Sequence, residues 1–164
     1  MIYRVAQFIA AVTAKMTEDD ISYVKGLLNE KEQALFFQLR IYEQAHCLKV
    51  ARNMDAQSSN FNIKERWELS RIALLHDIGK IKYPLNPIEK SIIVVLNKLT
   101  KGKIKKVTWL KMVKCYYTHA QIGAELLKEI GTYDAAFIEA IRSHHDMNIT
   151  SEKISLLQRC DNAA

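Results

Sequence analysis

The sequence has 164 residues, of which 49% are hydrophobic and 26% are charged, and its formal net charge is +6. This length and composition suit one globular domain with a continuous core and exclude a disordered chain. The positive charge is compatible with a polyanion, a membrane surface or a phosphorylated small molecule as partner, and it does not choose among them.

Helical periodicity recurs almost throughout the sequence, and the scarcity of Gly and Pro favours helix over sheet. Thr17 precedes three acidic residues and predicts a helix N-cap, Asn62 predicts another, and Pro87 can open a helix. A lysine-rich connection is expected at Thr100–Lys106. The predicted helices are Tyr3–Ala14, one from Thr17 to about Leu28, Glu30–Gln57, one from Asn62 that ends between His76 and Gly79, Ile88–Leu99, Trp109–Tyr117, His119–Ile130, Tyr133–His145 and Glu152–Asn162.

The three cysteines, Cys47, Cys115 and Cys160, are widely spaced and form no Cys-x-x-Cys pair, so a structural zinc knuckle is not expected. The apolar start, Met1–Val12, is interrupted by Arg4, is too short for a membrane span and lacks a small-residue cleavage site. We therefore expect a packed first helix, reduced thiols, no membrane partner and a cytoplasmic protein.

All five histidines lie on the apolar faces of predicted helices or at helix ends. His46 shares a face with Leu39 and Tyr42, and His119 shares one with Ile122, because residues three and four apart lie on the same side of a helix. Adjacent pairs are about 100° apart and reach one cavity if it lies at the helix end. The inward polar residues form a set of seven: His46, His76, Asp77, His119, His144, His145 and Asp161.

One inward histidine has an ordinary explanation in a hydrogen bond to the core. A buried polar group without a partner costs about 1–3 kcal/mol, and a lone carboxylate costs much more. Five predicted helices each direct a His or Asp inward, so a shared divalent cation explains them together. Imidazole nitrogen with carboxylate oxygen suits Mn, Fe, Co, Ni or Zn rather than Ca.

The segment Leu74–Lys80, which reads LLHDIGK, resembles the central motif of the HD superfamily of phosphohydrolases. That pattern is a His, a His-Asp doublet and a distant Asp on helices around a metal. Binuclear members carry further histidines between the doublet and the last Asp. The residues that match in order are His46, His76, Asp77, His119, His144, His145 and Asp161.

The resemblance covers Arg40–Asn162 and leaves the first 39 residues without a motif. It implies an all-α fold, a single-domain helical bundle of the HD-domain type over residues 1–164, with 40–162 as the HD core and a metal site at its centre. Members that cleave cyclic di-GMP carry a Gly-Tyr-Pro signature, which is absent here. The short connection to Asp161 is more like the small HD proteins that hydrolyse diadenosine tetraphosphate, but those typically differ at the second of the paired histidines.

The resemblance implies one or two divalent ions, from Fe, Mn, Co, Ni and Zn with Mg also open. His46, His76 and Asp161 would hold one ion, and Asp77 would bridge to a second. His119, His144 and His145 would hold that second ion. A third metal is not expected, because Tyr42 stands where some trinuclear relatives have a carboxylate.

Two basic residues are candidates for contact with a substrate phosphate. The resemblance places Lys80 near it, and the alternative is a solvent-facing lysine after a helix end. Arg40 can grip phosphate or pair with Glu43 or Glu65. The lysines of segment 98–114 can steer an anion, but a solvated loop is the default interpretation. Nucleic acid is not favoured as a partner, because no aromatic residues are interleaved with these lysines.

The function that follows is a metal-dependent phosphohydrolase, a phosphomonoesterase or phosphodiesterase. Its substrate would be a nucleotide, a dinucleotide or a related phosphorylated small molecule, attacked by a metal-activated water. Two alternatives stay open: a non-catalytic nucleotide-sensing or metal-binding HD domain, and a di-iron oxygenase. The sequence predicts no oligomeric state.

Overall fold

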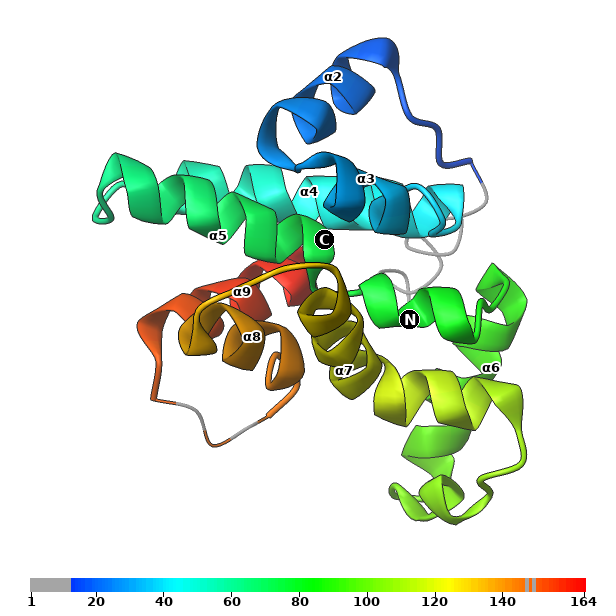
Figure 1. Cartoon of the computed structure of the whole chain (residues 1–164). Coiled ribbons are helices and arrows are strands. Elements are labelled where there is room, and N and C mark those ends of the chain that lie inside the picture. Colours follow the sequence, from blue (N-terminus) through cyan, green and yellow to red (C-terminus); the bar gives the residue numbers. More distant parts are fainter. Residues whose placement is uncertain (1–12, 147, 149) are drawn as a thin grey trace.

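A computed structural model describes residues 13–146, 148 and 150–164, and this part of the chain is helical with no strand (Figure 1). Most of the predicted helix Tyr3–Ala14 lies outside the described residues, and positions 13 and 14 are not helical. The described elements are α2 (Glu18–Leu27), α3 (Glu30–Phe36), α4 (Ile41–Gln57), α5 (Ile63–Leu75), the 3-10 helix η1 (Ile78–Lys82), α6 (Pro87–Leu99), the 3-10 helix η2 (Lys103–Lys106), α7 (Lys111–Ile130), α8 (Ala135–Arg142) and α9 (Glu152–Ala163).

Reciprocal hydrogen bonds between a cap residue and an acidic residue of the first turn fix the start of four of these helices. Thr17, Asn29, Asn62 and Asn86 each accept a hydrogen bond from a backbone N–H of the first turn. In each case an acidic residue three positions later accepts one from the cap's own N–H. The predicted caps at Thr17 and Asn62 are confirmed, and Pro87 opens α6 as predicted.

The prediction of one long helix over Glu30–Gln57 is wrong, because the chain breaks between α3 and α4. Two buried side chains satisfy the backbone at the break. The carboxylate of Glu43 accepts a hydrogen bond from the Arg40 N–H at 3.1 Å, and the amide of Gln44 donates to the Leu39 carbonyl at 2.8 Å. These bonds replace the ones that a continuous helix would make, so the turn is stable.

The predicted helices Trp109–Tyr117 and His119–Ile130 are instead one continuous helix, α7. The Thr118 hydroxyl between them donates to the Lys114 carbonyl at 2.6 Å, a bond that a threonine inside a helix makes. His119 therefore lies in the middle of a long helix and is buried.

The last predicted helix before the C-terminal one, Tyr133–His145, is shorter at both ends than expected. Asp134 caps α8 by accepting a hydrogen bond from the Phe137 N–H at 2.7 Å, and the helix ends at Arg142. The turn that follows carries the two adjacent histidines. Their side chains therefore need not point about 100° apart, as adjacent side chains on a helix do.

The helices pack around one main core. Helix α4 lies against α5 and α9, and α7 lies against α8 and against η1, the element that follows α5 (Figure 1). Burying one large aliphatic side chain contributes about 1.5–3 kcal/mol. The largest fully buried side chains are Phe36, Met54, Leu69, Ile72, Leu74, Leu75, Ile78, Ile93, Leu127, Ile141, Leu156 and Leu157. In the described part of the chain, every helix is too short or too polar to cross a membrane.

Two glycines let η1 touch the backbone of α7. A Cβ built on Gly79 would lie 2.6 Å from the Gly123 nitrogen and 2.8 Å from the carbonyl carbon of His119. Real Cβ atoms do not approach backbone this closely, so only glycine permits the contact at position 79. The contact fixes the distance between the segment that follows α5 and the middle of α7.

A buried ion pair joins α3, α5 and the connection between α7 and α8. Glu32 is 0% exposed and pairs with Arg71, and the Tyr133 hydroxyl donates to Glu32 Oε1 at 2.9 Å. The guanidinium of Arg71 also stacks over Trp67, 4.5 Å from the ring centroid. The network therefore ties three separate parts of the bundle together.

We expect Glu32→Gln to lower the free energy of unfolding by about 3 kcal/mol, because it leaves the guanidinium of Arg71, whose side chain is only 16% exposed, without its counter-charge. Glu125→Gln is the matched control: Glu125 is 49% exposed and pairs with Lys128 and Arg142, so its loss costs under about 1 kcal/mol. Urea unfolding of both variants measures the difference. Equal losses would show that the network does not stabilise the bundle.

Candidate metal centre

The seven predicted ligand residues come together where the ends and middles of several helices meet. His76 is the C-cap of α5, and Asp77 follows it. His46 lies in α4, His119 in α7 and Asp161 in α9. His144 and His145 lie in the turn after α8. Turns therefore place the two adjacent pairs, and helices place the other three residues.

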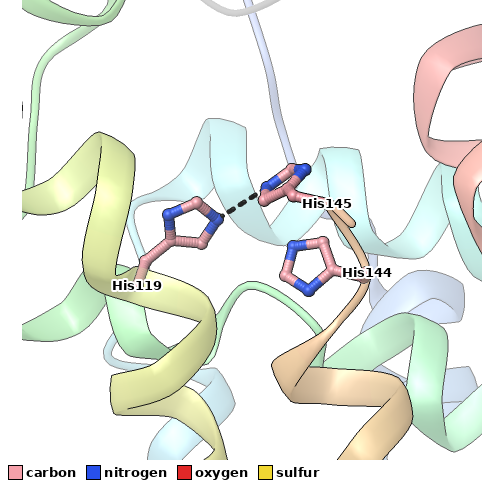
Figure 2. Close-up of side chains that lie close together, drawn as sticks. All are labelled: His119, His144 and His145. Atoms are coloured by element: carbon pink, nitrogen blue, oxygen red, sulfur yellow. Dashed lines mark hydrogen bonds between the residues drawn. The ribbon is translucent and has the colours of Figure 1, made fainter. Parts of the chain in front are cut away.

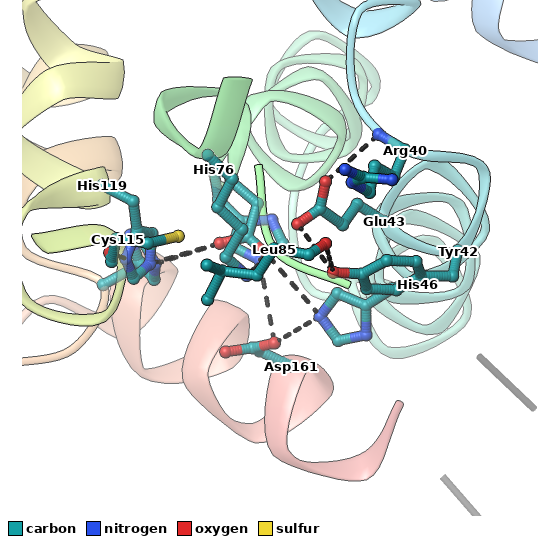
Figure 3. A network of polar contacts seen from close by, with 12 residues as sticks. Arg40, Tyr42, Glu43, His46, His76, Leu85, Cys115, His119 and Asp161 are labelled. Carbon is teal, nitrogen blue, oxygen red and sulfur yellow. Dashed lines mark hydrogen bonds and ion pairs between the residues drawn. The ribbon is translucent and has the colours of Figure 1, made fainter. Parts of the chain in front are cut away.

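One group consists of His46, His76 and Asp161, whose ligand atoms lie within 4.8 Å of one another (Figure 3). The Nε2 atom of His46 is 2.8 Å from Oδ1 of Asp161, and Nε2 of His76 is 3.7 Å from the same oxygen. Two imidazole nitrogens and a carboxylate oxygen therefore face a common point. This group could hold a metal ion.

A second group consists of the three remaining histidines, His119, His144 and His145, again with ligand atoms within 4.8 Å (Figure 2). The Nε2 atoms of His119 and His145 are 3.0 Å apart. The His144 and His145 rings lie with their centroids 4.0 Å apart. Three imidazoles this close could hold a second ion.

Asp77 lies between the two groups, with one oxygen toward each. Its Oδ2 atom is 3.5 Å from Nε2 of His76 and 4.0 Å from Nε2 of His46. Its Oδ1 atom is 3.3 Å from Nε2 of His119 and 3.9 Å from Nε2 of His144. A single carboxylate can therefore reach both groups at once.

Backbone carbonyls orient three of the imidazoles. The Nδ1 atoms of His76, His119 and His144 bond to carbonyls of the preceding turn at 2.7, 2.7 and 2.6 Å. A ring that donates its Nδ1–H to a carbonyl keeps Nε2 unprotonated and directed the other way. The Nε2 atoms of all three rings thus face the centre, where a bound cation would take the place of any proton on them.

The donors fit a divalent transition metal. Among the described residues, Nε2 of His76 and Nε2 of His144 are buried without a hydrogen-bond partner. A buried polar atom without a partner is costly, and a cation would satisfy both. Imidazole and carboxylate donors are those that Mn, Fe, Co, Ni and Zn accept.

The pKa values of the ligand groups match this use. Burial, together with the neighbouring imidazoles, holds the pKa of His144 well below its usual value and lowers that of His145 to about 4. Burial alone would raise the pKa of Asp77, but Lys80 and His76 hold it well below the usual value. Burial opposes the charge on His76, yet Asp77 raises its pKa well above normal. At neutral pH His144 and His145 are therefore neutral and Asp77 is charged, while His76 carries a proton that a cation can replace.

A third group was not foreseen from the sequence: Cys47, His76 and Asp77 also have ligand atoms within 4.8 Å of one another. Burial raises the pKa of the Cys47 thiol, which keeps it protonated and a weak ligand. Two of its three members belong to the arrangement already described. The sequence gives no signal for it, because Cys47 shares the apolar face of α4 with Val50 and Ala51.

Polar side chains of α4 continue the network beyond the metal ligands (Figure 3). The Tyr42 hydroxyl bonds to the Leu85 carbonyl at 2.8 Å and to Oε1 of Glu43 at 3.2 Å. Glu43 is 2% exposed, and burial raises its pKa. Its position three residues before His46 is the only sequence signal that it faces the site.

Lys80 and Arg40 are placed differently. Lys80 forms an ion pair with Asp77 and is 12% exposed, so it does not face solvent. Arg40 is exposed at the start of α4. Among the described residues, its guanidinium makes no ion pair with Glu43 or Glu65, so the structural pairing considered from the sequence is not found. Glu43 instead bonds to its backbone N–H, and Glu65 pairs with Lys153.

The lysines of the segment between α6 and α7 are exposed. Lys101, Lys103, Lys105 and Lys106 lie in and beside η2, which has no buried residue. The default interpretation of a solvated connection therefore agrees with the structure. The segment contributes no ligand to the centre.

A model of the HD domain family matches residues 44–163, which is well over half of the chain. A search of curated proteins and a search of solved structures each found no match. The chain therefore belongs to the HD domain family, a superfamily of metal-dependent hydrolases.

Proposed function

We propose that this protein is a phosphohydrolase that uses two divalent ions bridged by Asp77. The observation that carries the proposal is the position of that carboxylate, with Oδ2 toward His46 and His76 and Oδ1 toward His119 and His144. Two metal ions about 3.5–4 Å apart and bridged by a carboxylate are typical of phosphatases and nucleases. We further propose that residues 40–162 form the catalytic core of a single domain.

Each of the two groups of candidate ligands would hold one ion. His46, His76 and Asp161 would hold one ion, and the second would be held by the group of His119, His144 and His145. When bound, such ions lower the pKa of water to near neutrality and offset charge on phosphoryl oxygens. The substrate would be a phosphoester of a nucleotide, a dinucleotide or a related small molecule.

The chain's own residues provide positioning. Backbone carbonyls hold three rings with Nε2 toward the centre, so the donor atoms are in place before any ligand binds. The ammonium of Lys80 pairs with Asp77 and keeps that carboxylate charged. His145, the exposed member of the second group, lies on the side from which a substrate can approach.

A panel of phosphoesters tests the proposal. Protein loaded with Mn²⁺, Fe²⁺, Co²⁺, Ni²⁺ or Zn²⁺ is expected to release phosphate or a nucleoside monophosphate from at least one substrate, and His76→Ala is expected to release none. Oxygen consumption without phosphoester cleavage would favour an oxygenase instead. Metal and nucleotide binding without either reaction would favour a sensing domain.

Removal of metal is expected to destabilise the protein, because the buried nitrogens of His76 and His144 lose the cation that satisfies them. An ion present at about 100 times its Kd contributes roughly 2.7 kcal/mol. Thermal unfolding before and after treatment with a chelator, and again after addition of Mn²⁺ or Zn²⁺, measures this contribution. A Tm that does not respond to either treatment would contradict a metal site in the folded protein.

A further inference from the structure

Lys90 is a cation beside the metal centre that the ligand set does not use. It lies in the first turns of α6 and is partly buried. Its ammonium lies over the ring of Tyr42, 5.8 Å from the centroid. Within the part of the chain that the structure describes, this ammonium has no hydrogen bond and no carboxylate within 4.0 Å, whereas that of Lys80 is paired with Asp77.

The packing of α6 determines where Lys90 points. Ile93 is fully buried and packs in a small cluster with Leu85, Val113 and Cys115. Lys90 precedes Ile93 by three residues and therefore shares its inward face. The side chain is thus directed inward, and its ammonium reaches the ring of Tyr42 on α4.

The surroundings of Lys90 are charged. The ammonium of Lys80 is the main cause that lowers the pKa of Lys90, with burial second, while Asp77, Glu43 and Asp161 act in the opposite direction. In Figure 3, Tyr42 and Glu43 lie on the side of His46, opposite His119. Two ammonium groups therefore repel each other at the edge of the proposed metal site.

An anion that binds near both lysines would relieve this repulsion. A compact ammonium suits a phosphate oxygen, and Lys80 is already paired with a ligand carboxylate. Lys90 has no such partner and stands farther from the ligand carboxylates. Lys80 is thus committed to the carboxylate of the proposed ion site, whereas the ammonium of Lys90, with no such partner among the described residues, is free to contact a phosphate beside that site.

We propose that Lys90 binds a second phosphoryl group, so that the preferred substrates carry two linked phosphates, as in a nucleoside di- or polyphosphate. This inference rests on the proposed function for the identity of the reacting phosphate. It concerns binding, so it is tested without turnover.

The test is calorimetric titration of the Mn²⁺-loaded full chain with methylenediphosphonate and, separately, with methylphosphonate, neither of which is hydrolysed. Wild-type protein is expected to bind the diphosphonate at least about 10-fold more tightly than the monophosphonate. Lys90→Met is expected to reduce this preference by about 10-fold relative to wild type, and Lys90→Arg, which keeps the charge, is expected to retain most of it. Because both probes can also ligate Mn²⁺, the comparison is made between variants.

Lys98→Met is the matched control, because Lys98 lies on the same helix with the same charge but is exposed. It is expected to keep the wild-type preference. A preference in Lys90→Met equal to that of wild type, or no preference in wild-type protein, would overturn the role of Lys90. An intact preference in a protein that cleaves no phosphoester would instead count against the proposed function and leave the two-phosphate site standing.

Discussion

Replacing Asp77 with Asn is expected to remove metal from both groups and to abolish hydrolysis. The carboxylate is 2% exposed, and its two oxygens face different pairs of imidazoles. An amide has the same shape, but it lacks the charge and presents only one acceptor oxygen. Changes in residues that merely orient metal ligands cost about 10–100-fold in affinity, so loss of a shared ligand should cost about 100-fold or more.

The same substitution is also expected to lower the stability of the metal-free protein. Lys80 would lose its partner and stay mostly buried, and a buried charge left unpaired costs about 3–5 kcal/mol. Metal content by mass spectrometry and unfolding in urea measure the two effects on one preparation. Lys80→Met combined with Asp77→Asn should recover part of the stability but none of the metal.

Asp55→Asn is the control for loss of one carboxylate. Asp55 is 52% exposed and pairs with Arg66 at 2.8 Å on the surface. Its replacement should leave metal content and activity unchanged and cost under about 1 kcal/mol. If Asp77→Asn binds two ions like the wild type, a shared carboxylate is not what assembles the centre.

Gly79→Ala is expected to damage the centre without changing any ligand. The new methyl would collide with the backbone of His119 and Gly123, so η1 and α7 must move apart. Overpacking typically costs about 1–3 kcal/mol, and the upper end is expected here because backbone cannot yield as a side chain does. Separation of η1 from α7 also moves Asp77 away from His119, so the second group should bind its ion more weakly than the first.

Gly26→Ala is the matched control, because it lies in helix α2 and a Cβ there meets nothing within 4 Å. Alanine is the better helix former, so this change is expected to be neutral or to stabilise by up to about 1 kcal/mol. Unfolding in urea and metal titration distinguish the two variants. Equal stability and equal metal affinity in both would show that the glycine contact does not position the centre.

The clustering of the candidate ligands could be predicted in part from helical periodicity. His46 and His119 each share a helix face with apolar residues, and that pattern places both at the centre of the bundle. The adjacent His144 and His145 reach one place because α8 ends at Arg142, whereas the sequence predicted a helix through His145. The motif around Asp77 then indicated the family.

The break between α3 and α4 could not be predicted, since it depends on tertiary burial. Glu43 and Gln44 read as ordinary helix-forming residues. Only in the folded chain are both buried, and their side chains then bond to the backbone of the turn before them. Local sequence does not show which polar side chains the surrounding helices will enclose.

Lys90 was missed for a related reason. Helix α6 carries an apolar stripe that is exposed, and the buried side instead contains Ile93 and Lys90. The hydrophobic pattern of the sequence predicts that the apolar stripe faces the core and that Lys90 faces solvent. The exposed residues of the stripe are Ile88, Ile92, Val95 and Leu99.

The most direct test of the central claim is anomalous diffraction from crystals of the Mn²⁺- or Zn²⁺-loaded protein. Two peaks are expected about 3.5–4 Å apart. One should lie among His46, His76 and Asp161, the other among His119, His144 and His145, with Asp77 between them. A single peak, or peaks away from Asp77, would contradict a binuclear centre.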